Sequence, residues 1–126
     1  MSQTNTPDAN MIAARYIDLW NEKTPHRRRD ILTANWASDA RYVDPLQSCD
    51  GHDGIDAMIA GIQQRFPEFR FTLIGTPNGY ADHVRFSWGL GPVGVDSPIK
   101  GTDFAVVRDG RIQSITGFLD QVPQSA

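Results

Sequence analysis

The hydrophobic residues near the start of the chain recur at helical spacing. Ile12, Tyr16, Leu19 and Trp20 stand at positions i, i+4, i+7 and i+8, which lie on one face of a helix. The preceding Thr6-Pro7-Asp8 combines a capping residue, a proline and an acid, as helix starts often do. We therefore predict a helix that begins at this tripeptide and buries its apolar face.

Two more helices are predicted in the first half of the chain. Thr24-Pro25 repeats the start signal, and the second helix extends from there to about Asn35. The third is capped by Asp53 and ended by Pro67. It carries an apolar stripe at helical spacing made of Ile55, Met58, Ile59, Ile62 and Phe66.

Strands are predicted in two places. Residues 40–44 form a short strand closed by Pro45, because the residue before a proline is disfavoured in the helical conformation, and a loop follows over 46–53. After residue 68 the hydrophobic period becomes two, and turns are expected at Pro77-Asn78-Gly79, across 91–98 and at Asp109-Gly110. The strands between these turns are predicted over 69–74, 81–90, 99–108 and 111–120.

This order of elements predicts an α+β fold in which N-terminal helices pack on one face of an antiparallel sheet. The late strands carry apolar residues at both parities, as Val106 and Val107 or Ile112 and Ile115 illustrate. A sheet that is apolar on both faces is covered on both. Because the helices cover one face, we expect a second copy of the chain to cover the other, giving a homodimer.

Length and charge narrow the class of protein. The 126 residues suffice for one domain, expected over 11–122 with a frayed segment over 1–10. A net charge of −3 argues against a nucleic-acid partner, and the short basic run Arg27-Arg28-Arg29 is expected to be a solvated helix face. No apolar run reaches the roughly 18 residues of a membrane span, and no signal peptide is recognisable, so a cytoplasmic protein is expected.

Several short sequence motifs, taken in their order and spacing along the chain, resemble those of the NTF2-like superfamily in its SnoaL-like and ketosteroid-isomerase-like branch. The resemblance implies a cone, in which a curved antiparallel sheet wraps around a long helix and encloses a deep apolar pocket. Members are commonly homodimers, and they include isomerases, cyclases, hydrolases and non-enzymes, so the fold does not determine the function. The motifs are Trp36–Pro45, Gly54–Ala57, Phe66-Pro67, Gly101–Phe104, Asp109–Ile112 and Phe118–Asp120.

Tyr16, Asp44 and Asp103 fall at the positions that ketosteroid isomerases use. The resemblance implies that Asp44 moves a proton from one carbon to another, while Tyr16 and a protonated Asp103 donate hydrogen bonds to the enolate oxygen. Preset donors aimed at a developing charge are usually the largest catalytic contribution. The same-face neighbours of Asp103 are the uncharged residues Gly101, Ala105 and Val107, and such surroundings raise the pKa of a carboxyl group.

Each candidate also has a purely structural interpretation. Tyr16 lies on an apolar helix face and can be a core tyrosine, and Asp44 can hydrogen-bond the backbone of the turn at Pro45. Asp103 can form an ion pair with Arg85 on the preceding strand, since an unpaired buried charge is unfavourable. The pocket walls, and hence the substrate-binding residues, are expected to include Trp20, Phe66, Trp88 and Phe118.

Other chemistries are less well supported. The limonene-epoxide-hydrolase branch needs an Arg-x-Asp on a middle strand, where this chain has Arg85-Phe86-Ser87, and a further Asp on the last strand, where it has Thr116-Gly117-Phe118. The segment Cys49–Asp53 has metal-ligand residue types but no second cluster to complete a site, and His83 is expected on the surface. No phosphate loop or dinucleotide fingerprint is present.

We therefore expect no metal and no cofactor. The leading hypothesis is a cofactor-independent acid/base enzyme, ketosteroid-isomerase-like, that acts on a small hydrophobic carbonyl compound. The alternatives are a SnoaL-like polyketide cyclase or dehydratase, and a non-catalytic module that binds a hydrophobic ligand or dimerises.

Overall fold

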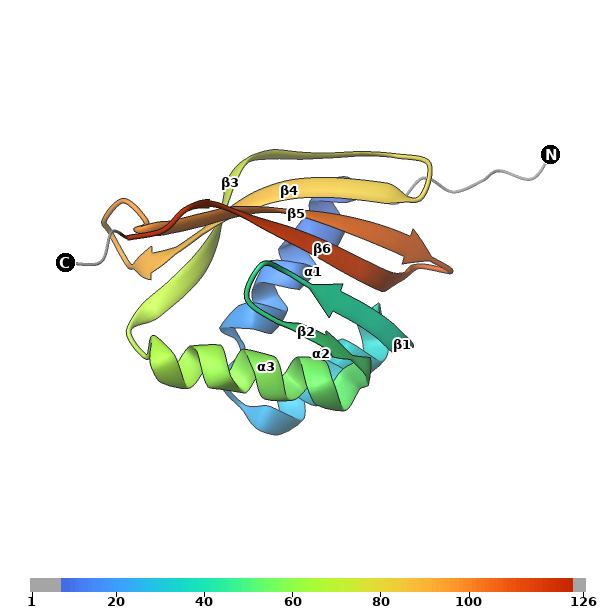
Figure 1. The fold of residues 1–126 in the computed structure, drawn as a ribbon. Coiled ribbons are helices and arrows are strands. Elements are labelled where there is room, and N and C mark those ends of the chain that lie inside the picture. The colour runs from blue at the N-terminus through green and yellow to red at the C-terminus, as the bar shows by residue number, and fades with distance from the viewer. Residues whose placement is uncertain (1–7, 124–126) are drawn as a thin grey trace.

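Three helices lie on one side of a curved six-stranded sheet in the computed structural model, which describes residues 8–123 (Figure 1). The predicted α+β class is confirmed. The helices are α1 (Ala9–Asn21), α2 (Pro25–Asn35) and α3 (Gly51–Arg65). The strands are β1 (Trp36–Val43), β2 (Ser48–Asp50), β3 (Phe69–Tyr80), β4 (His83–Pro92), β5 (Ile99–Arg108) and β6 (Arg111–Gln121).

The helix starts follow local capping chemistry, with one correction. Asp8 caps α1 by accepting a hydrogen bond from the backbone N–H of Met11 at 3.2 Å, and Thr24-Pro25 begins α2 as predicted. Thr6 and Pro7 lie outside the described residues. The third helix begins at Gly51 rather than after Asp53, because β2 forms where a loop was predicted and delivers the chain to the helix earlier.

The sheet order is β2-β1-β6-β5-β4-β3, and one pairing differs from expectation. Strands β3 to β6 form an antiparallel meander, but β1 pairs with β6 in parallel, so the sheet is mixed rather than wholly antiparallel. Consecutive strands joined by short turns are antiparallel, whereas β1 and β6 are far apart in sequence and their relative direction is free of that constraint.

Strand β3 is longer than predicted, and the turn at Pro77-Asn78-Gly79 was wrong. The strand continues to Tyr80, and the chain reverses at Ala81, which has a positive φ of 50°. The register with β4 shifts between Ile74 and Asn78, where Gly75 has a φ of 70°. Because β3 is an edge strand, it tolerates the proline within it. The Asp109-Gly110 turn is present as predicted, with positive φ at both residues.

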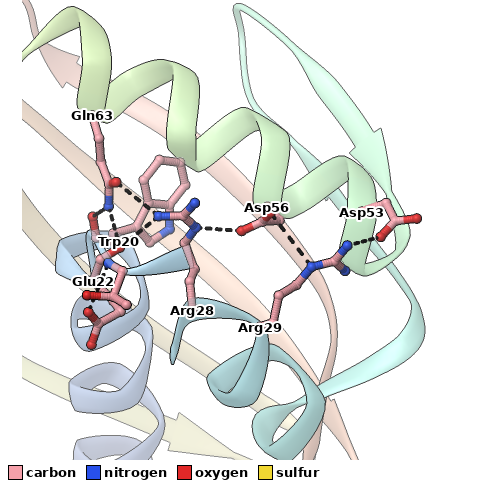
Figure 2. Close-up of polar contacts among 8 residues, drawn as sticks. Trp20, Glu22, Arg28, Arg29, Asp53, Asp56 and Gln63 are labelled. Carbon is pink, nitrogen blue, oxygen red and sulfur yellow. Dashed lines mark hydrogen bonds and ion pairs between the residues drawn. The ribbon is translucent and has the colours of Figure 1, made fainter. Parts of the chain in front are cut away.

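The prediction of a solvated basic run on α2 is wrong for Arg28, which is only 4% exposed, whereas Arg27 and Arg29 are exposed as predicted. Figure 2 shows its side chain reaching from α2 toward α3 and the end of α1. Its Nε lies 2.5 Å from Asp56 Oδ1, and its Nη1 donates to the Glu22 carbonyl at 2.9 Å and to Gln63 Oε1 at 3.1 Å. A buried guanidinium with three acceptors ties the helices together, and periodicity alone does not reveal it.

The two faces of the sheet differ in cover. The concave face packs against the helices through a continuous core that includes Tyr16, Trp36 and Phe86. On the opposite face Phe104 and Phe118 pack edge to face, with ring centroids 5.8 Å apart, and are 40% and 53% exposed. Within residues 8–123 no helix has the length and apolar character to cross a membrane.

Candidate active site

A cavity of about 330 Å³ opens between α1, α3 and the concave face of the sheet. All seven catalytic and substrate-binding candidates named from the sequence border it: five lie in α1, β4, β5 and β6, and Asp44 and Phe66 come directly after β1 and α3. The remaining wall is largely apolar, and its members include Ile62, Phe71, Leu90, Ile99 and Leu119.

Asp103 is the most buried acid of this site, at 1% exposure. The Tyr16 hydroxyl donates a short hydrogen bond to Oδ2, and the indole Nε1 of Trp88 donates to Oδ1 at 3.1 Å. The ion pair with Arg85 is not formed. Arg85 stands opposite Phe104 rather than Asp103, so strand alternation directs it to the other face of the sheet.

Gly101 makes the contact between Trp88 and Asp103 possible. Gly101 lies directly opposite Trp88 in the sheet, and a Cβ on it would come within 2.7 Å of Cε2 of the indole. The missing side chain lets the indole lie across β5 and reach the carboxylate two residues away. Trp88 was predicted from the sequence as an apolar part of the cavity wall, and its role as a hydrogen-bond donor was not predicted.

Burial raises the pKa of the Asp103 carboxyl to about 6, although the hydrogen bonds from Tyr16 and Trp88 act in the opposite direction. At pH 7 about a tenth of the molecules would therefore carry the neutral acid that the resemblance implies. Burial, followed by the charge of Asp103, also raises the pKa of Tyr16 well above its ordinary value. Tyr16 thus remains a proton donor at any physiological pH.

Asp44 sits just beyond the end of β1 and is held by three donors. Its Oδ1 accepts from the backbone N–H groups of Leu46 at 2.8 Å and Gln47 at 3.0 Å. Its Oδ2 accepts from the Tyr42 hydroxyl at 2.6 Å. Asp44 thus hydrogen-bonds the backbone of the turn, as its structural interpretation predicted, and it also borders the cavity. Tyr42 was not among the predicted site residues, although its i, i+2 spacing from Asp44 along a strand was a signal for this contact.

Gly117 brings the two carboxylates into one site. A Cβ at Gly117 would lie 2.8 Å from Asp103 Oδ1 and 3.3 Å from Asp44 Cβ. Gly117 faces Asp103 across β5 and β6, and the parallel pairing of β6 with β1 brings the end of β1 alongside. The mixed sheet is therefore what places Asp44 next to the pair formed by Tyr16 and Asp103.

The four apolar candidates occupy different parts of the cavity. Trp20 packs deep inside against the rings of Tyr16, Tyr42 and Phe71, while Phe66 stacks on Phe69. Phe118 borders the cavity, but its half-exposed ring packs on Phe104 at the opposite face of the sheet. Trp88, as described above, reaches Asp103.

The remaining polar candidates lie elsewhere. His83 is exposed on β4, with Nδ1 2.7 Å from Asp82. Cys49 is half-buried, and its Sγ lies 3.8 Å from the sulfur of Met58. Among residues 8–123 no group of three or more His, Cys, Asp or Glu side chains is arranged to hold a metal ion.

Comparisons with known proteins agree with this architecture. Residues 13–115 match a family model described as a SnoaL-like domain. A crystal structure from Agrobacterium tumefaciens, provisionally assigned as an isomerase of the SnoaL-like family, is 43% identical, with a TM-score of 0.85 over 89% of this chain and 97% of that one. A search of curated proteins found no match.

Two more distant structures share the fold. One, from Kribbella flavida and provisionally assigned as a ketosteroid isomerase, is 20% identical, with a TM-score of 0.68 over 94% of this chain and 82% of that one. The other, from Jannaschia sp. CCS1 and provisionally assigned as a SnoaL-like polyketide cyclase, is 17% identical, with a TM-score of 0.68 over 94% and 92%.

Proposed function

The chain belongs to the SnoaL-like domain family, and from that premise we propose that it is a cofactor-independent acid/base enzyme that moves a proton within a small hydrophobic carbonyl compound. One observation carries the proposal: Asp44 and the hydrogen-bonded pair of Tyr16 and Asp103 border one apolar cavity on either side of Gly117. The provisional assignments of the neighbouring structures as isomerases and a cyclase are consistent with it.

Asp44 is the proposed base. Its carboxylate takes a proton from the carbon next to the carbonyl group, and the electrons of that C–H bond form the enolate. The same carboxyl returns the proton to another carbon, so that the net reaction is an isomerisation. The three donors that hold Asp44 fix the approach of its oxygens, and a base must come within about 3 Å of its proton.

Tyr16 and Asp103 are the proposed donors to the enolate oxygen. While Asp103 is ionised, it accepts the Tyr16 proton and competes with the ligand for it. Once Asp103 is protonated, its own O–H becomes a donor and the pair has a proton free for the ligand. A negative charge developing on the ligand raises the pKa of Asp103 further and so favours this form.

The cavity limits the substrate. Its volume of about 330 Å³ is near the lower end of ligand pockets, which span about 300–1,000 Å³. The walls offer few polar groups apart from those already assigned. A compact, mostly hydrocarbon molecule with one carbonyl group fits this chemistry.

The test is solvent-deuterium incorporation into a panel of enolisable cyclic ketones and β,γ-unsaturated ketones, followed by NMR. Asp44→Asn removes the base, and we expect a loss of about 10²- to 10⁴-fold in exchange rate. Asp39→Asn is the matched control, because Asp39 is an exposed acid on β1, the strand that leads to Asp44, and does not border the cavity. Exchange that is equal in Asp44→Asn and the unmodified protein would contradict the proposal.

A non-catalytic ligand-binding module is the second candidate. It is favoured by the hydrogen bond between Tyr16 and Asp103, which occupies both groups when Asp103 is ionised. A binding module would show no exchange with any ketone and the same ligand affinity in Asp44→Asn. A polyketide cyclase or dehydratase that uses Asp44 as its base would lose its rate in Asp44→Asn while retaining affinity.

A further inference from the structure

The hydrogen bonds around Asp44 distinguish its two carboxylate oxygens. A carboxylate oxygen has two lone pairs that can accept. Both lone pairs of Oδ1 are used, because the backbone N–H groups of Leu46 and Gln47 donate to it at 2.8 and 3.0 Å. Within residues 8–123, Oδ2 receives one donor, the Tyr42 hydroxyl at 2.6 Å. The acceptor position that the protein leaves to a ligand is therefore on Oδ2.

The fold holds both partners of the hydrogen bond between Tyr42 and Asp44. Tyr42 lies on β1, which is paired with β2 on one side and with β6 on the other. Its side chain is 3% exposed, and its ring packs on that of Trp20 at a centroid distance of 6.0 Å. The backbone N–H of Asp44 donates to the Gln47 carbonyl at 2.9 Å, so the turn fixes the backbone from which the carboxylate projects.

The same hydrogen bonds suit both protonation states of Asp44. Burial, followed by the charge of Asp103, raises the pKa of Tyr42 far above its ordinary range, so its hydroxyl remains a donor. A proton on Oδ2 would use the remaining lone pair, and a protonated carboxyl group retains acceptor capacity for all three donors. Asp44 can therefore take up and release a proton without rearranging its partners.

We propose that Tyr42 is a positioning residue, which directs the remaining lone pair of Asp44 Oδ2 at one hydrogen of the substrate. This inference deepens the proposed function and rests on it, since it takes Asp44 as the base. The proton leaves the α-carbon for Oδ2, the electron pair of the C–H bond passes into the enolate, and Oδ2 returns the proton to another carbon. Tyr42 keeps its own proton throughout. Because the donor occupies one side of Oδ2, we expect removal of one of the two hydrogens on the α-carbon.

The experiment uses 1-indanone, whose two C2 hydrogens are mirror-related and therefore exchange equally in buffer alone. Exchange in D₂O is stopped at low conversion, and the two monodeuterated enantiomers are counted by ²H NMR in a chiral liquid crystal. We expect the unmodified protein to prefer one hydrogen by about tenfold or more, since a fixed base reaches one near-attack geometry.

Tyr42→Phe keeps the ring and removes the hydroxyl. The preference should fall below about threefold, because the carboxylate loses the contact that fixes Oδ2. The kcat of exchange should fall about tenfold, the effect of one hydrogen bond to a charged group, with KM within about twofold. Tyr80→Phe is the matched control, because Tyr80 is 73% exposed and does not border the cavity, and it should change neither quantity.

Three results would overturn the inference. One is an unchanged preference in Tyr42→Phe, even with a lower rate, since that outcome would give Tyr42 a merely structural role. Another is equal removal of both hydrogens by the unmodified protein, a measurement that does not depend on any variant folding. The third is an absence of exchange with 1-indanone.

The proposed function fails on different results. Exchange that Asp44→Asn abolishes, but that is as selective in Tyr42→Phe as in the unmodified protein, would support the proposed function and overturn the inference about Tyr42. Exchange that Asp44→Asn leaves unchanged, or no exchange across the whole ketone panel, would overturn both.

Discussion

Replacing Asp103 by Asn tests whether the buried carboxyl group of Asp103 destabilises the fold when it is ionised. The amide has nearly the shape of the acid. Its oxygen can accept from Trp88 Nε1, and its NH₂ group can donate to the Tyr16 hydroxyl, which accepts as well as donates. The substitution therefore removes the charge and leaves both partners satisfied.

The expected magnitude follows from the pKa of Asp103. Burial raises that pKa to about 6 in the folded protein, whereas an aspartate in an unfolded chain has a pKa of about 3.9. The folded state thus binds the proton more tightly, so the stability due to Asp103 is complete below about pH 4 and is lost as the pH rises through about 6. The whole effect is about 3 kcal/mol, of which about 2 kcal/mol falls between about pH 4.5 and about pH 7.5.

Urea unfolding followed by tryptophan fluorescence measures this difference. The free energy of unfolding of the unmodified protein minus that of Asp103→Asn should fall by about 2 kcal/mol between about pH 4.5 and about pH 7.5. Taking the difference cancels every other titrating group, and Asp39→Asn, in an exposed position, serves as a control that should show no such trend. A difference that stays constant within about 0.5 kcal/mol would refute the reasoning.

Four further predictions concern the candidate site, the helix contacts of Arg28 and the outer face of the sheet. The ketone exchange rate should rise as the pH falls from about 8 to about 6, because neutral Asp103 frees a proton for the enolate oxygen, and Asp103→Asn should remove that rise; a flat profile in the unmodified protein would contradict this. Gly117→Ala inserts a methyl group 2.8 Å from Asp103 Oδ1. It should lower the free energy of unfolding by about 1–3 kcal/mol and also lower the ketone exchange rate. If both quantities stayed unchanged, the close packing of Asp103 on Gly117 would be contradicted. Arg28→Met removes the buried guanidinium and leaves the half-buried Asp56 with only its longer ion pair to Arg29, at 3.8 Å. It should cost about 3 kcal/mol in urea unfolding, and a loss close to zero would mean that the contact between Arg28 and Asp56 contributes little. We propose that the sheet face carrying the exposed Phe104 and Phe118 packs against the same face of a second copy. Sedimentation at tens of micromolar should then report a dimer, and Phe104→Asp should dissociate it. A 14.0 kDa species alone would argue against the dimer.

Local patterns accounted for much of the secondary structure. Helical spacing identified α1 and α3, Thr24-Pro25 marked the start of α2, and Asp109-Gly110 marked the hairpin between β5 and β6. These features depend on neighbours within a few residues, through side-chain periodicity, capping and turn conformation. Where a local rule failed, as at Pro77 in β3, the edge position of the strand removed the penalty that the rule assumes.

The residues of the candidate site were predicted through a family resemblance, but the hydrogen bonds and contacts that join them were not. Asp103 attracted notice as an acid in an apolar strand, but its partners Tyr16 and Trp88 are 87 and 15 residues away. The role of Gly117 between the two carboxylates does not follow from composition or spacing, whereas the i, i+2 spacing of Tyr42 and Asp44 was a local signal for their hydrogen bond. Arg28 likewise looked solvated, because its acceptors belong to α1 and α3.

The sequence by itself determined the class of fold, most of its elements and the residue types available for acid/base chemistry, because those properties are written in short-range patterns of polarity and shape. The tertiary structure alone decided that β1 lies parallel to β6 and that Asp44 lies near Asp103 across Gly117. Such contacts join residues distant in the chain, and they depend on how whole elements pack rather than on any local preference.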